Sequence, residues 1–213
     1  MLKQRVITAL ILALLFVFVL VAVPPALFPI LIMLAVLLAG WEWAKLASIN
    51  SALGKGAFLL ILTLLLFLAY YLLQVSGDFN RQLSYQICLF ALALWAVILL
   101  WIQGYPSSAI LWANSPIIIC MGLIILTTTW IAFTAIFLYE NGQWLLGLAI
   151  LVVVLADLGG YFVGNLFGRH KLAELVSPGK TREGFVGGLV LQLFLILFLK
   201  DEVSLAFKVE HHV

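Results

Sequence analysis

The polar residues that could do chemistry are concentrated between Asp157 and Gly188, in a chain that is otherwise almost entirely apolar. Asp157 and Tyr161 lie in an apolar stretch with regularly spaced glycines, and a basic segment follows with the sequence Ser177-Pro178-Gly179-Lys180-Thr181-Arg182-Glu183. Cations, hydroxyl groups and the free amides at the start of a helix are all groups that bind phosphate. Since the surrounding chain is apolar enough to lie in a membrane, the pattern predicts chemistry on a lipid phosphate.

One face of the predicted helix that contains Asp157 carries most of its polar and small residues, namely Asp157, Tyr161, Gly164, Asn165 and Gly168. A carboxylate in hydrocarbon is costly, so Asp157 is expected to face the bundle interior or a water-filled cavity, where it is a candidate catalytic residue. The glycines at GxxxG spacing are typical of close helix packing, and both interpretations can hold together. Gly184, Gly187 and Gly188 predict a second packing face on the helix that follows.

The basic segment is expected to be a loop that binds substrate. Lys180 and Arg182 supply charge, Ser177 and Thr181 supply hydroxyl groups, and Thr181 is a suitable N-cap for a helix that starts near Glu183. An ordinary positively charged loop beside a membrane is the alternative interpretation. A P-loop is excluded, because Glu174 stands where its first glycine would be and no strand is expected before it.

The composition defines the class of protein that must position these residues. Hydrophobic residues make up 66% of the chain and charged residues only 9%, which a soluble domain would not tolerate. The apolar runs are continuous rather than alternating, which favours helices over a β-barrel. We therefore predict an all-α, polytopic transmembrane helix bundle, a single membrane-embedded domain over 1–213 with about seven spans. The expected spans are 6–23, 26–43, 57–74, 84–102, 117–138, 144–167 and 185–200.

Two details refine this organisation. Pro24 and Pro25 favour a tight turn between the first two spans over one long kinked segment. With a cytoplasmic N-terminus, the seven spans would place eight of the 11 Lys and Arg residues on the cytoplasmic side, including those of the segment from Arg169 to Glu183. Cys88 and Cys120 lie in apolar spans and are interpreted as small buried residues.

The residues from Asp157 to Gly188 resemble one family. The pattern Asp157-x-x-x-Tyr161-x-x-Gly164-x-x-x-Gly168-x-x-Lys171-Leu172, followed by Ser177-Pro178-x-Lys180-Thr181-x-Glu183-Gly184-x-x-Gly187-Gly188, is similar to that of the phosphatidate cytidylyltransferase (CDP-diacylglycerol synthase) family. The resemblance implies a nucleotidyltransferase of phospholipid biosynthesis that condenses CTP with phosphatidate to CDP-diacylglycerol and pyrophosphate. It implies a multi-pass protein of the cell membrane, in bacteria the inner membrane, with its site on the cytoplasmic face.

The resemblance also implies roles for residues. Asp157 and Lys180 would be catalytic, and substrate would be bound by Tyr161, Lys171, Ser177, Thr181, Arg182 and Glu183. Mg²⁺ would be the cofactor, with ligands that are unknown in this chain. CTP, phosphatidate and the bilayer would be the partners, with no nucleic acid, and a homodimer is left open.

The chain departs from the family pattern in three places. Gly179 stands where a basic or polar residue is common, and Arg182 stands where an aromatic residue is common. The family's acidic, metal-holding C-terminal block has no counterpart before Val213. This predicts either a C-terminally incomplete chain or a divergent member that cannot do the chemistry alone. A polytopic transporter and a CTP-dependent lipid-alcohol kinase are the alternative functions.

Overall fold

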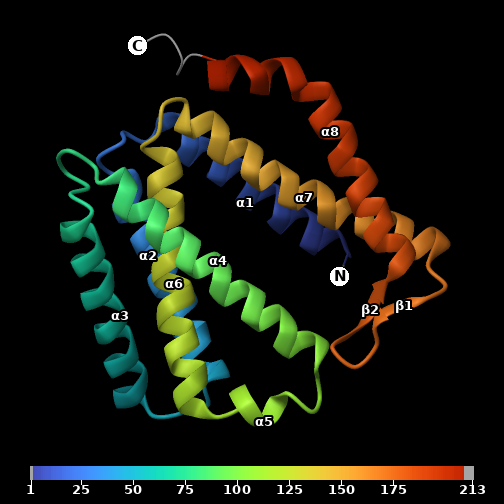
Figure 1. Ribbon diagram of the computed structural model, residues 1–213, viewed down its shortest axis with the longest axis horizontal. Coiled ribbons are helices and arrows are strands. Elements are labelled where there is room, and N and C mark those ends of the chain that lie inside the picture. Colours follow the sequence, from blue (N-terminus) through green and yellow to red (C-terminus); the bar gives the residue numbers. More distant parts are fainter. Residues whose placement is uncertain (1, 209–213) are drawn as a thin grey trace. The chain divides into compact units, whose positions relative to one another are not determined.

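The computed structural model describes residues 2–208, with residue 1 and residues 209–213 outside the description. By its internal contacts the chain divides into two compact units, Met1–Gln143 and Trp144–Val213 (Figure 1). The prediction of one domain over 1–213 is not tested by this division, because a membrane-embedded domain can contain more than one compact unit.

The first unit is made of helices. They are α1 (Leu2–Ala22), α2 (Phe28–Leu46), α3 (Ala52–Leu72), α4 (Arg81–Gln103), the short α5 (Ala109–Trp112) and α6 (Ser115–Phe137). The chain breaks between α1 and α2 at the two prolines, as predicted. Three later helices of this unit, α3, α4 and α6, follow a polar N-cap residue whose side chain accepts a hydrogen bond from a backbone amide of the first turn. These N-cap residues are Ser51, Asn80 and Asn114.

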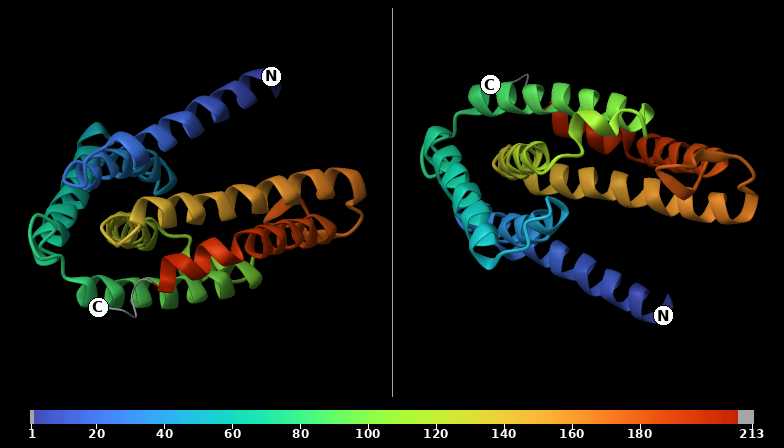
Figure 2. Two further views of the ribbon diagram at one scale, coloured as in Figure 1. Left: turned by 90° about the horizontal axis from the view of Figure 1, so that it is seen from above. Right: turned by 90° about the horizontal axis from the view of Figure 1, so that it is seen from below.

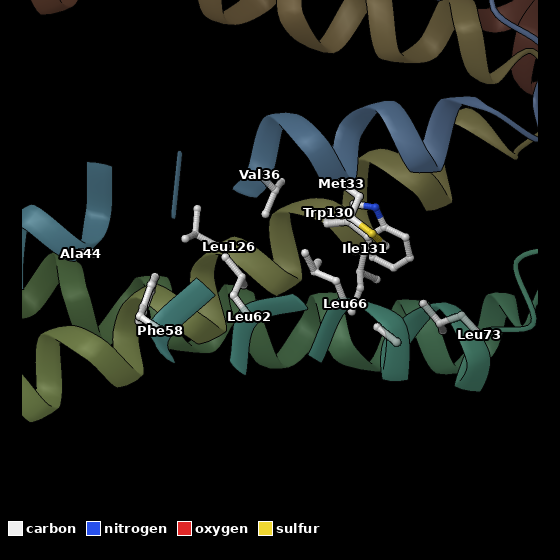
Figure 3. Close-up of a cluster of buried hydrophobic side chains, with 11 residues drawn as sticks. Met33, Val36, Ala44, Phe58, Leu62, Leu66, Leu73, Leu126, Trp130 and Ile131 are labelled. Atoms are coloured by element: carbon white, nitrogen blue, oxygen red, sulfur yellow. The ribbon is translucent and has the colours of Figure 1, made fainter. Parts of the chain in front are cut away.

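The core of the first unit is formed mainly by α2, α3 and α6 (Figure 3). Trp130 of α6 is fully buried and donates its indole N–H to the carbonyl oxygen of Pro29 at 2.8 Å. Trp43 of α2 donates in the same way to the carbonyl oxygen of Ile118 at 2.8 Å. These bonds satisfy the two polar atoms of the tryptophan rings and join α2 to α6 where apolar contacts alone would not fix their register.

The second unit contains α7 (Gly142–Phe167), the strands β1 (Lys171–Ala173) and β2 (Ser177–Thr181), and α8 (Arg182–Lys208). The strands pair antiparallel, with Lys171 opposite Thr181 and Ala173 opposite Ser177. They form a hairpin between the end of α7 and the start of α8, which Figure 1 shows beside the labels β1 and β2. The prediction of a loop here is therefore partly wrong, because the segment contains two short strands. The expectation that no strand precedes Glu174 is also wrong, since β1 ends directly before it.

Six helices in the part of the chain that the structure describes are long and apolar enough to cross a membrane. They are Phe28–Leu46, Ala52–Leu72, Arg81–Gln103, Ser115–Phe137, Gly142–Phe167 and Arg182–Lys200. The predicted all-α, polytopic membrane fold is confirmed. The first expected span, 6–23, falls on α1, and the side chains of its residues 6–10 and 12 lie outside the described ones, so the count of about seven is approximate. Figure 2 shows these long helices from two further directions.

Candidate functional site

Glycines bring α7 and α8 into direct backbone contact. A Cβ atom placed on Gly184 would lie 2.6 Å from the Gly160 carbonyl oxygen, and one placed on Gly159 would lie 2.7 Å from the Gly187 carbonyl oxygen. A Cβ atom placed on Gly188 would lie 2.8 Å from the Ala156 carbonyl oxygen. Any side chain at these positions would push the helices apart. Both predicted packing faces are thus confirmed, and they pack against each other.

Thr181 connects the hairpin to this helix pair. Its hydroxyl oxygen accepts a hydrogen bond from the amide of Gly184 at 3.1 Å, which caps the first turn of α8 as predicted. The same oxygen would be 3.1 Å from a Cβ atom on Gly164. Hairpin, α7 and α8 therefore meet at one threonine, and the absence of side chains on the glycines leaves room for it.

A cavity of about 710 Å³ opens between α7, β2 and the first turns of α8. We call it the polar cavity, and its polar lining includes Asp157, Tyr161, Asn165, Ser177, Lys180 and Thr181. Five of the eight residues predicted to form the site thus line one cavity. Both carboxylate and ammonium groups are present, and the volume lies within the usual range for small-molecule sites.

Asp157 and Lys180 form an ion pair in the lining of the polar cavity. The Lys180 Nζ atom lies 3.4 Å from the Asp157 Oδ1 atom, and the two side chains are 61% and 75% exposed. The pair is long and open, so each group is accessible to a ligand, and the pair itself contributes little to stability. Asp157 lies on a cavity wall, one of the two environments predicted for it, but the neighbouring helices do not enclose it.

The other three predicted site residues point elsewhere. The Lys171 ammonium group donates to the carbonyl oxygen of Pro178 at 2.5 Å and so joins the two strands of the hairpin. Arg182 and Glu183 line a separate apolar groove of about 620 Å³ between α7 and α8. The sequence suggested one joint phosphate site for Lys180 and Arg182, whereas the turn from β2 into α8 places them at different cavities.

Glu183 binds the backbone where α7 ends. Its carboxylate accepts hydrogen bonds from the amides of Arg169 at 3.1 Å and His170 at 3.2 Å. It also lies 2.6 Å from the His170 Nδ1 atom. This cluster was not predicted from the sequence, because Glu183 and His170 are 13 residues apart and only the hairpin brings them together.

The described residues do not contain a complete protein metal site. No three His, Cys, Asp or Glu side chains in the described part of the chain could hold a metal ion together. Asp157 is the one carboxylate in the lining of the polar cavity, and Mg²⁺ takes about six oxygen ligands, usually one or two of them carboxylates. These residues therefore do not fit a magnesium ion by themselves.

Comparison with known proteins places this fold and site in a family. The model of the cytidylyltransferase family matches residues 3–209. The phosphatidate cytidylyltransferase of Pseudomonas aeruginosa is 37% identical over 194 residues, which covers 89% of this chain and 67% of that protein. The phosphatidate cytidylyltransferase of Haemophilus influenzae is 32% identical over 209 residues, covering 92% and 71%. No solved structure matches the chain significantly. The chain belongs to the cytidylyltransferase family and is a nucleotidyltransferase of the membrane, with the resemblance seen in the sequence confirmed.

Proposed function

We propose that this protein transfers the cytidylyl group of CTP to phosphatidate, giving CDP-diacylglycerol and pyrophosphate. The observation that carries the proposal is the polar cavity, where Asp157 of the apolar helix α7 and Lys180 of β2 lie 3.4 Å apart. A lipid phosphate and a nucleotide could meet there while the acyl chains remain in the bilayer. The names of the two bacterial relatives support this choice of substrates.

The proposed reaction is an in-line displacement at phosphorus. An oxygen of the phosphatidate phosphate forms a bond to the α-phosphorus of CTP. The bond from that phosphorus to the oxygen bridging it to the β-phosphorus breaks, and pyrophosphate leaves with the electron pair. Two polyanions must approach each other, so the reaction depends on positioning and on neutralisation of charge more than on covalent catalysis.

The residues of the polar cavity would have distinct tasks in this reaction. Lys180 would place its positive charge on the phosphates as they react, because an open pair with Asp157 leaves its ammonium group able to rotate toward a ligand. Tyr161 of α7 and Ser177 of β2 would donate hydroxyl hydrogen bonds to the substrates. Asp157 would pair loosely with Lys180 before substrate binds and would accept hydrogen bonds from the ribose or from ordered water.

The proposal includes the place of the reaction. The hairpin and the polar cavity would face the cytoplasm, on the inner surface of a bacterial cell membrane, where CTP is available. The excess of Lys and Arg on the expected cytoplasmic side supports this orientation. The need for Mg²⁺ stays a prediction from the family resemblance.

Labelled CTP tests the reaction type. Membranes containing the complete gene product would be supplied with phosphatidate and with CTP carrying the label on either the α- or the γ-phosphate. The proposal expects the α-label in the lipid and the γ-label in pyrophosphate. Transfer of the γ-label to a lipid alcohol would instead define a kinase, and neither transfer, with the protein inserted in the membrane, would contradict the proposal.

A further inference from the structure

We propose that Glu183 is a positioning residue, which with His170 clamps the hairpin at its base and so holds Lys180 at the polar cavity. The carboxylate of Glu183 already has three partners, the amides of Arg169 and His170 and the His170 ring. It lines the apolar groove and not the polar cavity that contains Lys180. The inference rests on the proposed function only for the effect on activity.

The clamp joins the start of the hairpin, after α7, to its end, at the first turn of α8. Arg169 and His170 follow the last turn of α7, and Glu183 lies in the first turn of α8. The amide of Arg182 adds a further bond at the same place by donating to the His170 carbonyl oxygen at 2.9 Å. These contacts fix where the chain leaves α7 and where it enters α8, on either side of the strands.

The position of Lys180 at the polar cavity depends on the clamp, because the contacts of its own side chain do not fix that position. It lies next to the last residue of β2, and its one described contact is the open, exposed pair with Asp157. In the described part of the chain, the two strands are also joined by their antiparallel pairing and by the bond from Lys171 to Pro178, but these contacts hold the strands to each other and not to α7. Opening the base would therefore let β2 move away from the cavity wall formed by α7.

Distance measurements can test the clamp without any enzyme assay. Spin labels would be placed on cysteines at Leu158 in α7 and Glu174 in the hairpin turn, both exposed, in the complete gene product with Cys88 and Cys120 replaced by alanine. The clamp predicts a broader distance distribution for Glu183→Gln and for His170→Ala. Lys45→Ala, which removes an exposed lysine paired with Glu42 in the first unit, is the control and should leave it unchanged.

Kinetics of the unlabelled protein give the second readout. Glu183→Gln should lower kcat by about 10–100-fold, since small displacements of a catalytic group have effects of that size. His170→Ala should act in the same direction, and the double variant should be little worse than Glu183→Gln, because both changes open the same clamp.

The outcomes separate the two proposals. An unchanged distance distribution in both single variants would overturn the clamp, and if activity nevertheless fell, Glu183 would contact substrate. Additive kinetic effects of the two changes would also contradict it. If the unsubstituted protein transferred no cytidylyl group, the proposed function would fail, while the distances would still decide whether the clamp exists. If Glu183→Gln did not insert, His170→Ala, which retains the carboxylate, would decide the question.

Discussion

The hydroxyl group of Thr181 lies where the hairpin, α7 and α8 meet. It caps α8 through the amide of Gly184 and lies against the glycine surface of α7. Thr181→Val keeps the shape of the side chain and removes the hydroxyl oxygen that accepts the hydrogen bond. We therefore expect the first turn of α8 to be less stable by about 0.5–2 kcal/mol. Hydrogen exchange at the Gly184 amide measures this directly.

Thr181→Ser is the matched comparison, since serine retains the capping oxygen. Protection of the Gly184 amide should fall in the valine variant and persist in the serine variant. Equal protection in both variants would show that the cap contributes nothing.

At the scale of elements, the packing of α7 on α8 requires glycine. Gly184→Val would place its Cβ atom 2.6 Å from the Gly160 carbonyl oxygen and 3.2 Å from the Gly164 Cα atom, both of them backbone. The helices must then separate, at a cost of about 1–3 kcal/mol or more for overpacking. Unfolding in detergent should show this loss.

Gly56→Ala in α3 is the control for this change, because nothing lies within 4 Å of the added Cβ atom. Its stability should stay the same or rise slightly, since alanine favours helix over glycine. A Gly184→Val protein as stable as the control would contradict the close packing of α7 and α8.

The arrangement of α7, the hairpin and α8 could be predicted from the sequence only in part. The spacing of Gly160 and Gly164, and that of Gly184 and Gly187, identified two packing faces, but helical periodicity alone cannot say which faces meet. The strand β2 was not predicted, because Ser-Pro-Gly is typical of turns and the strands are only three and five residues long. Without the hairpin, neither the separation of Arg182 from Lys180 nor the contact of His170 with Glu183 could be foreseen.

At the scale of the whole molecule, the orientation in the membrane decides which substrates reach the polar cavity. We expect the hairpin to face the cytoplasm, because Lys and Arg concentrate on that side in the predicted topology. Glu174→Cys, in a protein whose two native cysteines are replaced by alanine, places one exposed thiol in the hairpin turn. A membrane-impermeant thiol reagent should label it in inverted vesicles but not in intact cells.

The same reagent applied to a cysteine at Asp78, in the connection between α3 and α4, provides the opposite control. Three helices long enough to cross the membrane, α4, α6 and α7, lie between the two positions, so its labelling pattern should be the reverse. Labelling of the Glu174 position in intact cells would contradict the proposed cytoplasmic site.

The central claim is that cytidylyl transfer takes place in the polar cavity, and the activity of Lys180→Ala tests it most directly. CDP-diacylglycerol formation would be measured in membranes containing equal amounts of the unsubstituted protein, Lys180→Ala and the control Lys45→Ala, whose lysine pairs with Glu42 and is not part of the cavity lining. We expect Lys180→Ala to lower kcat/KM by about 100–1000-fold, the effect of removing one group that stabilises charge in a transition state. Lys45→Ala should retain full activity. A Lys180→Ala protein as active as the control would contradict this placement of the reaction.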